Sequence, residues 1–153
     1  MVEPFRGSLS EFLPLFSHAD DSPAEINSYI ELGEVLVARS VQRIICHIQL
    51  IAVGADWEIK SVAVIEQQQG QGIGAALVRA ALDRAFSAGG SRVLVATATA
   101  DIDKLRFYQR LGFRMDRVER DAFSVDRGYP SLKVDDISVR DKVWFSINVN
   151  DRR

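Results

Sequence analysis

The chain has 153 residues, 47% of them hydrophobic and 26% charged, with a formal net charge of −2 and one cysteine, Cys46. The length suits a single domain over residues 1–153, and the composition excludes a disordered, collagen-like or coiled-coil protein. Without a basic excess, a long apolar run, a signal peptide or a second cysteine, we expect a cytoplasmic protein that binds neither nucleic acid nor membrane and holds no internal disulfide.

The first third of the chain predicts two short helices and a pair of strands. Ser22, Pro23 and Glu25 have the spacing of an N-cap, a first helical residue and a capping-box glutamate. Gly33 is placed to stop that helix. In chain order we expect an amphipathic helix over residues 8–16, a helix from Pro23 to Leu32, and hairpin strands over residues 34–39 and 43–53.

A strand–loop–helix–strand unit is expected in the middle of the chain. The segment from Ile73 to Ala88 is apolar around most of a helix circumference, so it should pack against a sheet. Residues 92–98 are small or β-branched without polar alternation, as in a parallel strand that is covered on both faces. With a strand over residues 57–65 before the helix, these elements form a βαβ unit with a right-handed crossover.

The last third predicts a helix, two strands and a long connection. The helix should run from Asp101, whose charge suits the positive end of a helix, to Leu111. Strands are expected over residues 113–123 and 142–149. Residues 124–140 between them form an irregular stretch whose length is typical of a functional or disordered loop.

A glycine-rich segment, Gln69-Gly70-Gln71-Gly72-Ile73-Gly74, lies between a strand and a helix N-terminus. Glycines let the backbone approach a ligand, and the first helical N–H groups favour phosphate. The segment lacks the Gly-Lys-Ser/Thr of a Walker A loop. It fits a dinucleotide-binding loop only in part, because the next strand ends without the expected acidic residue. A tight turn without a ligand and a pyrophosphate loop for coenzyme A are the other two interpretations.

A second motif favours the coenzyme A interpretation. Gln69-x-x-Gly72-x-Gly74 is followed, after the helix, by Phe107-Tyr108-x-x-Leu111-Gly112-Phe113. These motifs and the order of elements from Gly33 onward resemble the GNAT superfamily of N-acetyltransferases, and most of all its bacterial YvbK-like subgroup. The resemblance implies an α+β fold of three layers: a mixed, mostly antiparallel sheet with a central parallel pair splayed around the cofactor, and helices on both faces.

The resemblance also implies a binding site for acetyl-CoA. Pantetheine would lie along a strand that diverges from its parallel neighbour, and the pyrophosphate would lie on backbone N–H groups of the glycine loop. The asparagine that is frequent in the family is replaced by Thr99, or by Asp101 at the helix start. The cofactor-binding residues that the resemblance implies are Val62, Ala63, Val64, Gln69, Gly70, Gln71, Gly72, Ile73, Gly74, Ala75, Thr99 and Tyr108.

Glu58 and Tyr108 are the catalytic residues that the resemblance implies. Glu58 lies eleven residues before Gln69, the spacing of the strand glutamate that deprotonates an amine through water in the lysine-acetylating branch. An alkylammonium has a pKa of about 10.4 and must lose a proton before its nitrogen can attack. Tyr108 matches the tyrosine that protonates the leaving thiolate. The alternatives are an exposed edge carboxylate for Glu58, with Asp56 as the nearest other base, and a buried packing residue for Tyr108.

These residues predict an acetyl-CoA-dependent N-acetyltransferase that moves the acetyl group to a primary amine, in a small molecule or a peptide, by direct attack in a ternary complex. The alternatives are a non-catalytic acyl-CoA-binding sensor or regulatory module and a nucleotide-binding domain. Asp20-Asp21 and Asp135-Asp136 favour a cationic acceptor such as a polyamine, an aminoglycoside or a Lys peptide. No metal is expected, because His18 and His47 have no partners at metal-ligand spacing. A homodimer is compatible with the sequence.

Overall fold

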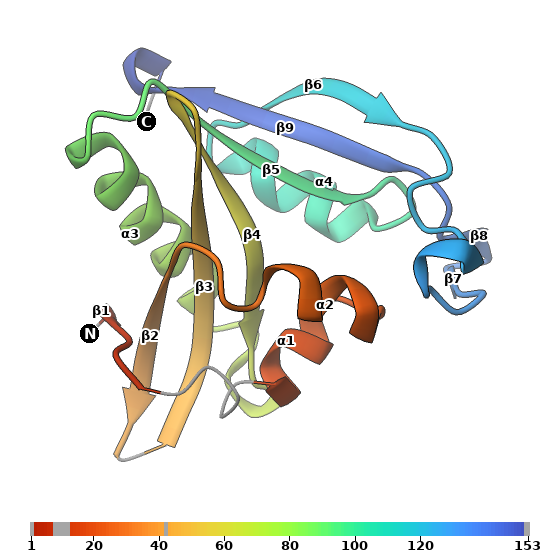
Figure 1. Ribbon diagram of the computed structural model, residues 1–153, viewed down its shortest axis with the longest axis horizontal. Helices are drawn as coiled ribbons and strands as arrows, with labels where there is room; N and C mark the ends of the chain where they lie inside the picture. Colours follow the sequence, from red (N-terminus) through yellow and green to blue (C-terminus); the bar gives the residue numbers. More distant parts are fainter. Residues whose placement is uncertain (1, 8–12, 42, 152–153) are drawn as a thin grey trace.

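The structure is a computed structural model that describes residues 2–7, 13–41 and 43–151. Its centre is a sheet of seven strands in the spatial order β1-β2-β3-β4-β5-β9-β6 (Figure 1). Among the described strands of this sheet, only β4 and β5 are parallel neighbours, which confirms the mixed, mostly antiparallel sheet with a central parallel pair. The strands are β1 (Val2–Pro4), β2 (Glu34–Ser40), β3 (Arg43–Val53), β4 (Asp56–Val64), β5 (Arg92–Ala98), β6 (Arg114–Glu119) and β9 (Lys142–Asn148).

Helices cover both faces of the sheet, as the sequence predicts (Figure 1). On the α3 face, Leu77, Val78 and Ala81 are fully buried against the strands, as expected of a helix that is apolar around most of its circumference. A second hydrophobic cluster on the opposite face is built around Phe16 and Ile26. The two helices of one face are α1 (Leu13–Ala19) and α2 (Pro23–Tyr29), and those of the other are α3 (Ile73–Ser87) and α4 (Ile102–Arg110).

The start of α2 is as predicted, but its end is not. The buried Ser22 caps the helix, because its hydroxyl accepts a hydrogen bond from the backbone N–H of Glu25 (3.3 Å). The helix ends at Tyr29 rather than at Leu32. The buried side-chain amide of Gln49 on β3 donates to the carbonyl oxygens of both Tyr29 (2.7 Å) and Leu32 (2.8 Å). A strand residue that is distant in sequence therefore satisfies the helix end.

Two other expected elements differ from their expected bounds by more than one residue. The strand expected over residues 113–123 is β6, which ends at Glu119, because Asp121 has a left-handed φ of 56° and turns the chain. Helix α1 continues past its expected end at Phe16. The part of that helix expected over residues 8–12 lies outside the described residues.

A β-bulge in β4 changes which side chains face which helices. The pairing of β3 with β4 shifts between Gln49 and Leu50, and this leaves Lys60 as one extra residue in β4. Before the bulge, Ile59 packs in the core on the α3 face. After the bulge, Ala63 packs in the core on the α1 and α2 face. The bulge therefore reverses which sheet face the odd-numbered side chains of β4 occupy in the second half of the strand.

The parallel ladder between β4 and β5 stops halfway along both strands. It joins Asp56–Ile59 to Arg92–Val95, and the bulge follows directly. Beyond this point β4 stays paired with β3, and β5 stays paired with β9. The facing edges of β4 and β5 therefore carry backbone groups that have no partner in the sheet. This is the splayed parallel pair that the sequence resemblance implies.

The long connection between β6 and β9 has secondary structure of its own. It contains a 3₁₀ turn at Val125–Arg127 and a small hairpin formed by β7 (Lys133–Val134) and β8 (Ile137–Ser138). Asp135 and Asp136 are the two turn residues of this hairpin, with φ of 51° and 64°. Aspartate is one of the few residues that two-residue hairpin turns with positive φ accept, so these two acids have a structural explanation.

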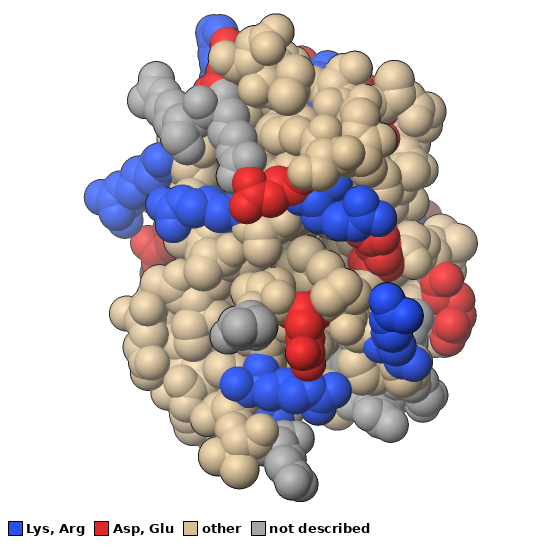
Figure 2. All heavy atoms as spheres, turned by 90° about the vertical axis from the view of Figure 1, so that its left-hand side faces the viewer, with Lys and Arg blue, Asp and Glu red and all other residues tan. Residues whose placement is uncertain are grey.

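The charged side chains of the outer surface are mixed in sign on the face shown in Figure 2, which is the left-hand side of Figure 1. Acidic side chains lie directly beside basic ones in a belt across the middle of this face. Ion pairs join Arg84 to Glu34 (2.7 Å) and Arg39 to Glu3 (3.1 Å). No helix in the described part of the chain is both long enough and apolar enough to cross a membrane.

His47 makes the fold sensitive to acid. The residue is 0% exposed on β3, its Nε2 lies 2.8 Å from Oγ of Ser61, and its ring stacks on Phe16 at 4.3 Å. Burial lowers the pKa of His47 from 6.5 to about 3. The folded protein therefore keeps this ring neutral at pH values where the unfolded chain takes up a proton. Stability is lost as the pH falls below about 6.5, and the loss continues toward about pH 3.

We expect the free energy of unfolding to fall by about 2 kcal/mol between about pH 7 and about pH 5 through this residue alone. Urea unfolding at the two pH values measures the difference. His47→Gln keeps a polar side chain that does not titrate, so the variant should lose most of this pH dependence. A variant with the parental pH dependence would show that another group carries it.

Candidate active site

A pocket of about 260 Å³ opens where β4 and β5 separate. Its walls come from distant parts of the chain: the α1–α2 junction, strands β4, β5 and β9, the start of α4, and the connection between β6 and β9. Three of the residues expected at the site, Glu58, Val62 and Tyr108, line it. The charged and hydroxyl-bearing residues of the lining are Asp20, Asp21, Glu25, Glu58, Lys60, Ser61, Thr97, Asp101, Lys104, Tyr108, Tyr129 and Lys142.

Glu58 lies on a central strand and faces the pocket. Its side chain is only 17% exposed, and its carboxylate lies 3.7 Å from Nζ of Lys60. Asp56, the other candidate base, is paired with Arg92 instead (2.9 Å) and does not line the pocket. The interpretation of Glu58 as an exposed edge carboxylate therefore does not hold, and of the two candidates Glu58 is the one that a ligand in the pocket can reach.

Tyr108 combines a packing position with access to the pocket. Its ring contacts Phe107, Phe113 and Phe145 at centroid distances of 5.0, 5.7 and 5.7 Å, and the residue is 2% exposed. Burial raises the pKa of Tyr108, and the charge of Asp101 raises it further. The phenol therefore keeps its proton at neutral pH and can act as a donor.

The glycine loop forms an open end at the N-terminus of α3. Gly70 and Gly72 have left-handed φ of 77° and 81°, and a Cβ added to either would meet no atom within 4 Å. Gly72 is the N-cap of α3, no side chain caps the helix, and no acidic residue lies in the first turn. Because the first N–H groups of a helix have no intrahelical acceptor, this end is available to an anion such as pyrophosphate.

Gln69 supports the loop through its side chain. Its backbone N–H donates to the carbonyl of Glu66 (3.2 Å) and is therefore not available to a phosphate. Its side-chain Nε2 donates to the carbonyl of Val64 (3.0 Å) and so ties the loop to the end of β4. The loop also meets the second motif, because a Cβ on Gly74 would lie 3.6 Å from the ring of Phe107. The structure thus brings the two motifs together.

Asp101 lines the pocket, whereas Thr99 does not. Asp101 caps α4 by accepting a hydrogen bond from the backbone N–H of Lys104 (3.2 Å). The N–H of Thr99 donates to the carbonyl of Asp141 (2.9 Å). The carboxylate of Asp101, one of the two residues that could replace the family's asparagine, therefore has a structural role at the helix start.

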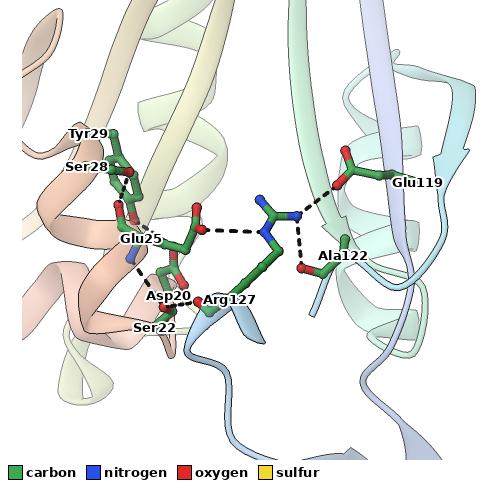
Figure 3. A network of polar contacts seen from close by, with 8 residues as sticks. All are labelled: Asp20, Ser22, Glu25, Ser28, Tyr29, Glu119, Ala122 and Arg127. Carbon is green, nitrogen blue, oxygen red and sulfur yellow. Dashed lines mark hydrogen bonds and ion pairs between the residues drawn. The ribbon is translucent and has the colours of Figure 1, made fainter. Parts of the chain in front are cut away.

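A network of polar contacts ties α2 to the connection between β6 and β9 beside the pocket (Figure 3). Arg127 donates to Glu119 (3.1 Å) and to the carbonyl of Ala122 (3.1 Å), and it lies 3.5 Å from the carboxylate of Glu25. Its own carbonyl accepts a hydrogen bond from the hydroxyl of Ser22 (2.7 Å). We call this set of contacts, made by Ser22, Glu25, Glu119, Ala122 and Arg127, the Arg127 clasp.

Asp20 serves as an acceptor for two tyrosines. Its carboxylate accepts hydrogen bonds from the hydroxyl of Tyr29 (3.0 Å) and the N–H of Ser22 (3.1 Å), and Tyr129 also bonds to it. Burial raises the pKa of both tyrosines, and Asp20 adds to the rise. The acids that favoured a cationic acceptor are thus mostly accounted for, because Asp20 is hydrogen-bonded and Asp135-Asp136 form a turn outside the pocket lining.

The sequence did not predict most of the other pocket residues, among them Lys60, Tyr129, and the β9 residues Lys142 and Trp144. Lys60 faces the pocket because of the bulge in β4. The positions of Lys142 and Trp144 depend on the pairing of β9, and that of Tyr129 depends on the path of the connection between β6 and β9. The length of residues 124–140 was the one signal that pointed to this region.

The similarity of the chain to known proteins identifies its family. A family model described as the acetyltransferase (GNAT) family matches residues 6–113. The chain belongs to the GNAT family. YvbK of Bacillus subtilis strain 168, described as an uncharacterized N-acetyltransferase, is 30% identical to this GNAT protein over 114 residues, which are 74% of each chain.

Solved GNAT structures have the same fold over nearly the whole chain. A GNAT family acetyltransferase from Elizabethkingia anophelis with acetyl-CoA bound has a TM-score of 0.90 at 25% identity, with 97% of each chain covered. An IAA acetyltransferase from Bacillus cereus ATCC 14579 has a TM-score of 0.88 at 28% identity, with 97% of this chain and 100% of that chain covered. The protein is therefore an acetyltransferase whose cofactor is acetyl-CoA, and its open glycine loop and splayed strands fit that molecule.

Proposed function

We propose that this GNAT enzyme moves an acetyl group from acetyl-CoA to the primary amine of a small molecule by direct attack in a ternary complex. The observation that carries the proposal is one pocket that joins Glu58 of β4, Tyr108 of α4 and the unpaired edges of β4 and β5. Residues 1–153 would act as a single domain in this reaction, because the pocket walls come from segments between Ala19 and Trp144.

Backbone groups would hold most of the cofactor. Val62, Ala63 and Val64 lie beyond the end of the parallel ladder, so backbone groups on their edge toward β5, apart from the Val64 carbonyl that Gln69 engages, can pair with the amides of pantetheine. The N–H groups from Gly70 to Ala75 would hold the pyrophosphate, and the side chain of Gln69 would stabilise the loop through its hydrogen bond to Val64. The backbone N–H of Thr99 is engaged, so a contact between Thr99 and the cofactor would have to come from its side chain.

Glu58 would act as the base. Bound acetyl-CoA supplies an activated acetyl thioester, but an acceptor that arrives as an ammonium cannot attack it until a proton is removed. The carboxylate of Glu58 can take this proton directly or through a water. This carboxylate already lies 3.7 Å from one ammonium group, Nζ of Lys60, which supports its pairing with the ammonium of an acceptor.

Tyr108 would act as the acid, because its side chain lines the pocket and its phenol is protonated at neutral pH, where the leaving thiolate needs a proton. A backbone N–H of the splayed part of β4 would stabilise the negative charge that develops on the carbonyl oxygen. The buried Cys46 is part of the core on the α3 face and does not line the pocket, so a covalent acetyl-cysteine has no place in this scheme.

The size of the pocket and the Arg127 clasp favour a small acceptor over a polypeptide. Small-molecule pockets commonly measure about 300–1,000 Å³, and the volume of about 260 Å³ lies just below that range. The clasp joins α2 to the connection on the far side of the pocket. An extended peptide that crossed this region would have to break these contacts.

Release of coenzyme A with a panel of primary amines tests the proposal, and Glu58→Gln tests the base. At neutral pH we expect this variant to lower kcat/KM by roughly a hundredfold or more, within the range for a lost general base. The rate should recover as the pH approaches about 10, where the amine is already deprotonated. The affinity for coenzyme A should not change.

Asp56→Asn is the matched control, since it makes the same chemical change two residues away at a side chain that is paired with Arg92. It should keep the parental rate. A Glu58→Gln enzyme with the parental pH profile would exclude Glu58 as the base. Tight coenzyme A binding without release for any amine would instead favour the non-catalytic acyl-CoA-binding module.

A further inference from the structure

Two basic side chains of the pocket, Lys104 and Lys142, form no ion pair among the residues that the structure describes. Lys142, the first residue of β9, lines the pocket, and its Nζ lies over the rings of Phe123 (5.3 Å) and Trp144 (5.9 Å). It forms no ion pair with any carboxylate of the residues that the structure describes. Burial lowers the pKa of Lys142, and the charge of Lys60 lowers it further. A bound anion would stabilise this ammonium.

Glu119 is the carboxylate best placed to neutralise Lys142, because the two residues are partners in the β6–β9 ladder. Its oxygens have other partners. One accepts a hydrogen bond from Arg127 (3.1 Å), and the other accepts one from the indole N–H of Trp144 (3.3 Å). Glu119 therefore forms no ion pair with Lys142 and acts on it only through its charge, which raises the pKa of the lysine, so Nζ of Lys142 keeps room for a ligand.

Small side chains of β5 line the pocket between Lys142 and Lys60. Ala96 and Ala98 of β5 line the pocket, and in the β5–β9 ladder they stand opposite Trp144 and Lys142. Lys60 lies on the other side of β5, at the bulge of β4. Both lysines face the same pocket, and their charges act on each other. An anion above the two alanines would lie between two ammonium groups.

We propose that Lys142 and Lys60 bind a carboxylate of the acceptor, and that the acceptor is an α-amino acid. This inference rests on the proposed function, because it needs Glu58 to face the amine of the same molecule. Glu58 lies 3.7 Å from Nζ of Lys60, so a negative and a positive group stand side by side in the pocket. An α-amino acid carries its ammonium and its carboxylate on one carbon, and it can meet both groups at once with charge-assisted hydrogen bonds.

One wall of the pocket indicates the side chain of this acceptor. It is apolar or aromatic and comes mostly from the connection between β6 and β9. Such a wall favours a large hydrophobic or aromatic side chain. These lining residues are Phe123, Tyr129, Leu132, Val134, Val139 and Trp144.

Matched pairs of acceptors test the carboxylate subsite. L-Phenylalanine with phenethylamine, and L-leucine with 3-methylbutylamine, differ within each pair only in the carboxylate. We expect the parent enzyme to favour the amino acid of each pair by about tenfold or more in kcat/KM, as for a charge-assisted contact in a pocket. Lys142→Gln should abolish that preference, and the kcat/KM for phenethylamine and 3-methylbutylamine should change little. Lys142→Arg should keep part of the preference.

Lys133→Gln is the control, since Lys133 is an exposed residue of β7 outside the pocket lining. It should behave as the parent does, and the affinity for acetyl-CoA should be equal in all variants. A parent that favours the plain amines, or a Lys142→Gln enzyme that keeps the parental preference, overturns the inference and leaves acetyl transfer intact.

A panel in which neither kind of acceptor is acetylated contradicts the proposed function instead. Calorimetry with N-acetyl-L-phenylalanine and N-acetylphenethylamine then decides the role of Lys142. Tighter binding of the acid that is lost in Lys142→Gln supports the subsite, and equal binding of the two compounds overturns it.

Discussion

Gly72→Glu should abolish the binding of coenzyme A while the fold persists. Gly72 is the N-cap of α3, and the space around an added Cβ is open, so the new carboxylate would lie where the pyrophosphate is expected. Like charge and occupied volume act together against the phosphates. We expect the Kd for coenzyme A, measured by calorimetry, to rise by at least about a hundredfold, which corresponds to about 2.7 kcal/mol.

Gly54→Glu is a closely matched control. Gly54 has a left-handed φ of 63°, near the 81° of Gly72, and an added Cβ also meets no atom within 4 Å. The backbone strain of a side chain at positive φ, about 1–2 kcal/mol, is therefore common to both variants. Gly54→Glu should bind coenzyme A as the parent does. Equal affinities in the two variants would exclude the glycine loop as the pyrophosphate site.

Tyr108→Phe should lower turnover by roughly ten- to a thousandfold, the size of effect expected for a lost proton donor. The substitution keeps the ring that packs against Phe107, Phe113 and Phe145, so the melting temperature and the affinity for coenzyme A should change little. Steady-state kcat, coenzyme A calorimetry and thermal unfolding of the same preparation separate these effects. Parental turnover would mean that water protonates the thiolate and that Tyr108 only packs α4 onto the sheet.

Local signals predicted most of the elements. The strand over residues 92–98 has the bounds expected from its β-branched run, and α2 begins at Pro23 because Ser22 caps it. The helix after the glycine loop ends at Ser87, one residue before the expected Ala88. These features depend on residues that are close in sequence, such as caps, glycines and apolar periodicity.

Features that depend on contacts distant in sequence were not predicted. The end of α2 is determined by Gln49 from another strand, and the side-chain alternation of β4 is interrupted at Lys60 by a bulge. The resemblance to a known family implied a splayed strand pair and the positions of Glu58 and Tyr108. It gave no indication of Lys142, because that residue reaches the pocket through the pairing of β9 with β5 and β6.

The connection between β6 and β9 has a consequence for how such an enzyme can diversify. It supplies Tyr129, Leu132, Val134 and Val139 to the pocket, but it adds no strand to the seven-stranded sheet. The glycine loop and α3, by contrast, contribute no residue to the pocket lining. Substitutions in the connection can therefore alter which acceptor fits without disturbing the cofactor loop or the sheet. New acceptor preferences can evolve in one surface segment while the reaction itself is inherited unchanged.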